Sequence, residues 1–197
     1  MPRFSLVFAM LAAALTVLPL AAGCGGRTSL RLTATDGSSE LAPRIITSAY
    51  SYEDENTVHI YLTNLSEAEL LGSWAAADAD RPVGQMTHIH MFIRPRPGRT
   101  PIDANASNTT IRHVILAPQS ATGVYAGGGF LLPTSAAASG TFKGSISAGT
   151  LTLDAASQNF ADALGAVRLR SSIRVEEDDE LAATIARRLN EAARTVR

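Results

Sequence analysis

The chain has 197 residues, and its 17 Lys and Arg residues nearly balance its 18 Asp and Glu residues, so the formal net charge at pH 7 is −1. This balance argues against a general nucleic-acid binder, which would need a basic face. The single cysteine, Cys24, excludes intrachain disulfides, iron–sulfur clusters and cysteine-rich zinc sites, and the length suits one domain with a sizeable core.

The first 23 residues have the pattern of a secretory signal peptide. Arg3 is the only charged side chain before Arg27, residues 4–20 are uncharged and mostly apolar, and small residues lead into Cys24. An uncleaved membrane span is the alternative interpretation. However, the uncharged stretch is only 17 residues long, at the lower limit of the roughly 17–25 that a transmembrane helix needs, and Pro19 interrupts it.

The block Leu20-Ala21-Ala22-Gly23-Cys24 resembles the lipobox of bacterial lipoprotein precursors. The match covers residues 1–24, with Ala21 where the class most often has Leu. The resemblance implies cleavage before Cys24, a diacylglycerol on its sulfur and an acylated amino terminus, so that several fatty chains hold the domain at the cell envelope. Gly25 after the cysteine resembles the outer-membrane pattern, with the domain on the periplasmic or outer face. Cleavage without lipidation is the other alternative.

Beyond Cys24, short runs of alternating or β-rich residues predict strands separated by turn signals. Such strands without long intervening helices indicate a mainly β chain, an antiparallel β-sandwich or barrel-like domain with a short C-terminal α-helix. Ser147-Ala148-Gly149 is read as a hairpin turn, and the proline-rich residues 94–101 as an exposed connector. The expected strands are residues 30–34, 44–52, 57–63, 86–94, 109–116, 123–132, 141–146, 150–153 and 167–175.

Two helices are expected. Ser66 and Glu69 have capping-box spacing before two leucines, which predicts a short helix. At the end of the chain, acidic residues 176–180 precede an apolar stripe of Leu181, Ile185 and Leu189 and a later group of arginines, an order that suits the helix dipole. This helix is expected to dock on the β domain, or alternatively to contact a partner or a membrane surface.

These patterns divide the chain into four parts: a signal peptide (1–23), the lipidated cysteine and a tether (24–29), the β domain (30–175) and the C-terminal helix (176–197).

The four histidines form the candidate metal site. His88 and His90 are two apart on a predicted strand, so their side chains leave one face about 6.6–6.8 Å apart at Cα. His59 and His113 also lie on predicted strands and would join them if those strands are neighbours. Met86 shares the face of the pair, and a His and Met site would favour copper over zinc. Alternatively, each ring is half-buried and bonded to its neighbours.

Other chemical signatures are incomplete. No G-x-S-x-G motif or P-loop is present, and Gly127-Gly128-Gly129 is better explained by backbone room at a turn or bulge. Asp103, Asn105 and Ser107 do not complete an EF-hand. Anion contact by the connector arginines remains a hypothesis, with a solvated loop as the alternative; they are Arg94, Arg96 and Arg99.

Three functions are therefore compatible with the sequence. The first is a non-enzymatic envelope lipoprotein, anchored in the membrane, whose β domain binds or assembles with an envelope protein or glycan. The second is an envelope protein that binds copper or zinc through strand histidines. The third is an enzyme of unrecognised type that acts on envelope glycan or lipid. A resident cofactor and nucleic-acid binding are not expected.

Overall fold

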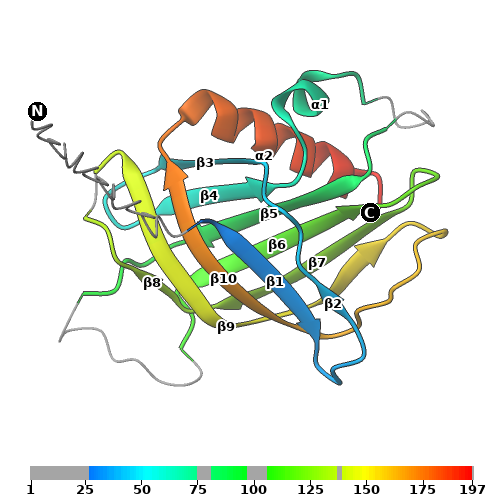
Figure 1. Ribbon diagram of the computed structural model, residues 1–197, viewed down its shortest axis with the longest axis horizontal. Coiled ribbons are helices and arrows are strands. Elements are labelled where there is room, and N and C mark those ends of the chain that lie inside the picture. The colour runs from blue at the N-terminus through cyan, green and yellow to red at the C-terminus, as the bar shows by residue number, and fades with distance from the viewer. Residues whose placement is uncertain (1–26, 75–80, 97–105, 137–138, 197) are drawn as a thin grey trace, which may run out of the picture.

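The computed structural model describes residues 27–74, 81–96, 106–136 and 139–196. They form one antiparallel sheet curled into a half-barrel, with two helices against it (Figure 1). The strands are β1 (Ser29–Ala34), β2 (Glu40–Leu41), β3 (Thr47–Tyr52), β4 (Val58–Thr63), β5 (Gly84–Met91), β6 (Thr109–Leu116), β7 (Thr122–Gly129), β8 (Leu131–Pro133), β9 (Thr141–Ala156) and β10 (Val167–Glu176), and the helices are α1 (Glu67–Leu71) and α2 (Asp179–Arg194).

The strand order is β2-β1-β10-β9-β7-β6-β5-β4-β3, with β8 paired to β9. The last strand of this order, β3, also meets the chain at the end of β10. Tyr50 forms a parallel bridge with Glu177, and its hydroxyl donates a hydrogen bond to that carboxylate at 3.1 Å. The backbone amide of Asp178 donates to the Tyr50 carbonyl, also at 3.1 Å.

Alternation along the strands gives the sheet two apolar faces. The inner face of the half-barrel holds one cluster, to which both ends of the strand order contribute, and the outer face holds a second cluster under α2. Buried inner residues include Leu32, Tyr50, Ile60, Ile89, Tyr125, Phe142, Leu169 and Ile173, and buried outer residues include Tyr61, Leu70, Met86, Val114, Val124, Ile185 and Leu189.

The predicted mainly β, antiparallel fold is confirmed in its barrel-like form, and one local prediction is wrong. Ser147-Ala148-Gly149 is not a hairpin turn, because β9 runs through it. There the register shifts from Leu169 opposite Gly149 to Ser171 opposite Ile146, so Ser147 and Ala148 form a bulge opposite Arg170. A Cβ on Gly149 would stand 3.3 Å from the Leu169 side chain, which explains a small residue at this position.

The helices confirm their sequence signals. Both halves of the Ser66–Glu69 capping box are present at α1. Asp178 caps α2 by accepting a hydrogen bond from the amide of Leu181 at 2.9 Å. Ile185 and Leu189 are buried against the sheet, so the expected docking of this helix on the β domain is confirmed. Among the described residues, no helix is long and apolar enough to cross a bilayer.

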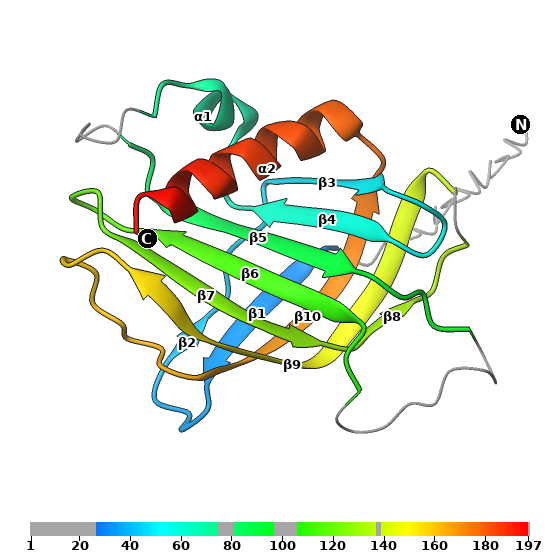
Figure 2. The same ribbon diagram turned by 180° about the vertical axis from the view of Figure 1, so that it is seen from behind.

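Helix α2 covers only part of the outer face. It packs over β3 to β7 and is joined to α1 by Arg188, whose guanidinium donates to the carbonyls of Leu70 and Gly72. The outward side chains of β1 and β10 are mostly exposed, as are many on β9. Figure 1 shows β1, β9 and β10 on the near side of the half-barrel, and Figure 2 shows β5, β6 and β7 from the opposite side.

Candidate metal centre

Three histidines meet on the outer face of the sheet, beside α2. His59 of β4 lies directly opposite His90 of β5 in the antiparallel register, and Tyr61 lies opposite His88. The rings of His59 and His90 stack with centroids 4.5 Å apart and planes 6° apart, and those of Tyr61 and His88 stack at 4.6 Å and 7°. Strand pairing therefore builds a compact group of aromatic rings with nitrogen donors at one end.

Glu53 completes a possible ligand set. It lies in the turn between β3 and β4, where its amide donates to the Thr57 carbonyl at 3.0 Å. One carboxylate oxygen is 3.4 Å from Nε2 of His59, and one ligand atom from each of Glu53, His59 and His90 lies within 4.8 Å of the other two. Zinc lies about 2.0–2.2 Å from nitrogen and oxygen ligands, so the three ligand atoms must move closer together to bind one ion. The Glu53 side chain can supply this movement because it is 67% exposed.

His88 orients the His59 ring. Nδ1 of His59 and Nε2 of His88 are 3.0 Å apart, a hydrogen bond in which one nitrogen donates and the other accepts. Burial, followed by the charges of His59, His90 and Arg112, lowers the pKa of His88 to about 3, so this ring is neutral and able to accept. In the tautomer in which Nδ1 of His59 donates, its Nε2, which lies 3.4 Å from the Glu53 carboxylate, carries the lone pair that binds a metal.

His90 also has a nitrogen available. Its Nε2 atom is buried and has no hydrogen-bond partner among the described residues. Burial and the neighbouring His59 lower the pKa of His90, while Glu53 opposes this effect. A buried nitrogen without a partner costs about 1–3 kcal/mol, a cost that a bound ion or ligand would remove.

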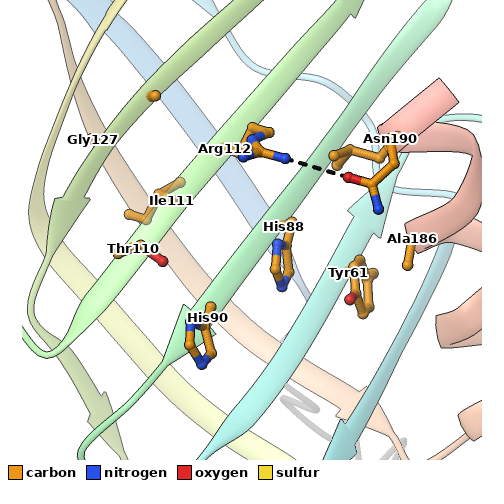
Figure 3. Close-up of a pocket in the computed structure, with 11 residues that line it drawn as sticks. Tyr61, His88, His90, Thr110, Ile111, Arg112, Gly127, Ala186 and Asn190 are labelled. Atoms are coloured by element: carbon orange, nitrogen blue, oxygen red, sulfur yellow. Dashed lines mark hydrogen bonds between the residues drawn. The ribbon is translucent and has the colours of Figure 1, made fainter. Parts of the chain in front are cut away.

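A cavity of about 440 Å³ opens beside the histidines, between β4 to β7 and α2. Figure 3 shows His88, His90 and Tyr61 along one side and Arg112 and Asn190 along another. The Arg112 guanidinium donates a long hydrogen bond of 3.4 Å to the Asn190 side-chain oxygen. The cavity gives a small molecule or water access to the group of rings, with a cation at its wall.

His113 does not join the other three histidines. It points to the inner face, is fully buried, and its Nδ1 lies 2.8 Å from the Thr87 hydroxyl. Burial lowers its pKa to about 4. Met86 shares the face of His88 and His90, as expected, but it is buried in the cluster under α2. No thioether therefore stands among the candidate ligands.

Glu53 was not singled out from the sequence because it lies in a turn, outside every expected strand. Its signal is positional. A hairpin between residues 52 and 58 brings the turn back beside His59, so an acid at its start falls next to the strand histidine.

The other predicted sites are engaged elsewhere or fall outside the described residues. Arg94 donates to the Tyr52 hydroxyl at 3.3 Å and to the Ser135 carbonyl, and Arg96 is 3.8 Å from the Glu55 carboxylate. Cys24 and Arg99 lie outside the described residues. Anion contact by this connector remains a prediction.

No protein-family model matches the chain, and neither the curated proteins nor the solved structures contain a match to it.

Proposed function

We propose that this protein is a lipid-anchored envelope protein that binds a divalent transition metal, zinc or copper(II), through Glu53, His59 and His90. One observation carries the proposal: a carboxylate oxygen and two imidazole nitrogens lie within 4.8 Å of one another on a rigid sheet and its turn. Two imidazoles and a carboxylate are a common set in open zinc sites, and imidazole also suits copper.

The neighbouring residues support a site with an open position. His88 fixes the His59 ring through the 3.0 Å hydrogen bond, as partners of metal-binding histidines usually do. The adjacent cavity would let water or a small ligand complete the coordination. Because Met86 is buried among apolar side chains, the donor set is hard or intermediate, which favours zinc or copper(II) over copper(I).

The proposed location comes from the amino-terminal sequence. Lipid on Cys24 would hold the domain at a bacterial membrane, where envelope proteins or glycans are within its reach. We assign no catalytic step to the site, and the function proposed is binding.

Metal loading of the processed protein tests the proposal. After treatment with a chelator, the protein is loaded in parallel with zinc and copper(II), and bound metal is measured after gel filtration and by titration calorimetry. We expect one ion per chain, and at least tenfold weaker binding in Glu53→Gln and in His90→Ala. His88→Ala should weaken binding by about 10–100-fold, as loss of a supporting hydrogen bond does.

Glu55→Gln is the matched control. Glu55 lies in the same turn, is 74% exposed and loses the same charge, but it faces Arg96 instead of the histidines. It should bind metal like the unaltered protein. The proposed site would be refuted if the unaltered protein retained neither metal, or if Glu53→Gln and His90→Ala retained metal as well as the unaltered protein does.

A further inference from the structure

The outer face left bare by α2 is basic. Five exposed cations point outward from three adjacent strands, and serines and threonines fill the outward positions between them. Glu40, Asp154 and Glu176 lie at the margins of this surface. We call the five cations the basic face; they are Arg31 of β1, Lys143 of β9, and Arg168, Arg170 and Arg174 of β10.

Like charges are placed directly opposite each other on the basic face. Arg31 pairs with Arg170 across β1 and β10, and Lys143 pairs with Arg174 across β9 and β10. Cross-strand cations repel each other and destabilise a sheet. Among the described residues, the only acid within ion-pair distance of any member is Glu40, which lies 2.7 Å from Arg31. The other four cations therefore have no compensating acid at ion-pair distance within the described residues, and the arrangement suits an external anionic surface.

The chain that leads to Cys24 leaves the domain at the same face. The Thr28 hydroxyl donates to the Arg174 carbonyl at 2.5 Å and accepts from the Arg174 amide at 3.0 Å, so residue 28 is fixed beside β10. Cys24 stands only four residues earlier, and four extended residues span at most about 14 Å. A bilayer that holds lipid on Cys24 must therefore lie close to Arg174.

Two further arginines extend the charge toward the tether. Arg27 and Arg44 line a hollow together with Arg31, next to the start of β1. Along β10, the cations from Arg168 to Arg174 span about 20 Å at the usual rise of a strand. Clusters of four to eight Lys and Arg next to a membrane attachment favour anionic lipids, at about 1 kcal/mol for each cation. The described outward positions of β1 and β10 carry no apolar residue, and the exposed apolar side chains beside the face are Ile46, in a hollow with Arg174, and Leu132 of β8, opposite Ser145.

We infer that the basic face docks on anionic phospholipid headgroups of the bilayer that holds Cys24. The docking rests on the proposed lipid at Cys24 and is independent of metal binding. Because β1, β9 and β10 lie on the side of the half-barrel opposite β5 and β6, docking turns the histidines and their cavity away from the bilayer (Figures 1 and 2). The site would then face solvent, where a soluble ligand can reach it.

Lys143 makes the test direct because it is the only lysine in the chain. The processed lipoprotein is placed in vesicles of phosphatidylcholine alone or with about one-third phosphatidylglycerol, and Lys143 labelling by a membrane-impermeant amine reagent is followed by peptide mass spectrometry. We expect labelling to be several-fold slower on the anionic vesicles, and high salt should abolish the difference. The mass of the amino-terminal peptide reports the lipid separately.

Charge variants complete the test. Arg168→Gln/Arg170→Gln should weaken docking about 30-fold and restore labelling of Lys143 on anionic vesicles, since two cations are lost. Arg187→Gln/Arg194→Gln, which removes two cations from α2, should leave protection intact. Unchanged thermal melting shows that each variant is folded. If mass spectrometry verifies the lipid on the amino-terminal peptide, equal labelling of Lys143 on neutral and anionic vesicles would overturn the docking. Equal effects of the two double variants on this labelling would also overturn it. An amino-terminal peptide without lipid would overturn the anchor and the docking together.

Discussion

The two halves of the outer sheet face differ in what covers them. Under α2, outward positions carry apolar or aromatic side chains such as Tyr61 and Met86, with the histidines where the cover ends. On the bare half, β10 alternates strictly between buried and exposed residues; every exposed one is polar, and every buried one except Ser171 is apolar. The same alternation thus distinguishes a strand with one wet face from a strand buried on both faces, such as β4, where only His59 among the six residues is not buried.

The covered half should carry most of the stability of this face. Leu189 is 1% exposed in the cluster between α2 and the sheet. Leu189→Ala should lower the free energy of unfolding by about 2–5 kcal/mol, since it removes buried methyl groups and leaves a cavity. Chemical denaturation measures the change. Ser172→Ala, at an exposed outward position of β10, is the matched variant and should change stability by less than about 0.5 kcal/mol. Equal costs at the two positions would contradict the contrast.

Lowering the pH should reduce the stability of the protein through its buried histidines. Burial lowers the pKa of His113 to about 4 from an ordinary value of 6.5, so the unfolded chain takes up a proton that the folded chain refuses. Stability should therefore fall as the pH drops from about 6.5 to 4, by roughly 3 kcal/mol for this residue. His88, with its pKa lowered to about 3, acts in the same direction.

His113→Gln isolates the effect of the inner histidine. Denaturation at a series of pH values gives the slope of stability against pH, which is read apart from the absolute stability of the variant. The slope between pH 6.5 and 4 should become shallower in His113→Gln and stay unchanged in Arg170→Gln. An unaltered slope in His113→Gln would show that folding does not shift the pKa of His113.

The smallest expected effect is a gain on the bare half. Arg170→Gln removes the repulsion with Arg31 and should raise the free energy of unfolding by about 0.2–1 kcal/mol. Arg168 is the control, because its cross-strand neighbours are the uncharged Thr33 and Thr150. Arg168→Gln should leave denaturation nearly unchanged. A loss of stability in Arg170→Gln would mean that the arginine pair is compensated within the domain.

Local patterns predicted the strands and helices well, because alternation and caps depend on neighbouring residues. The strand at 109–116 matches β6, and the Ser66–Glu69 cap forms as expected. The prediction of a hairpin at 147–149 was wrong because the glycine at 149 is explained by the close approach of Leu169 on β10, a residue distant in the sequence. A glycine at a bulge and a glycine in a turn look alike in sequence.

The candidate site was predictable in part for the same reason. His88 and His90 share a face by the two-residue period of a strand, which is a local property. Their meeting with His59 depends on β4 pairing with β5 across the intervening α1, and the exclusion of His113 depends on which face of β6 points inward. Which strands pair and which side chains point inward depend on the whole sheet and not on neighbouring residues.

The bridge between Tyr50 and residues 177 and 178 also affects whether the sheet can pair with other copies of the protein. An open sheet has two edges whose unpaired backbone groups can recruit strands from other molecules. One edge here is β2, only two residues long, and at the other the chain entering α2 occupies the Tyr50 carbonyl of β3. The start of the C-terminal helix thus protects the β3 edge from pairing with strands of other molecules. A chain shortened before Glu177 would expose β3 as a template for such pairing and hence for aggregation.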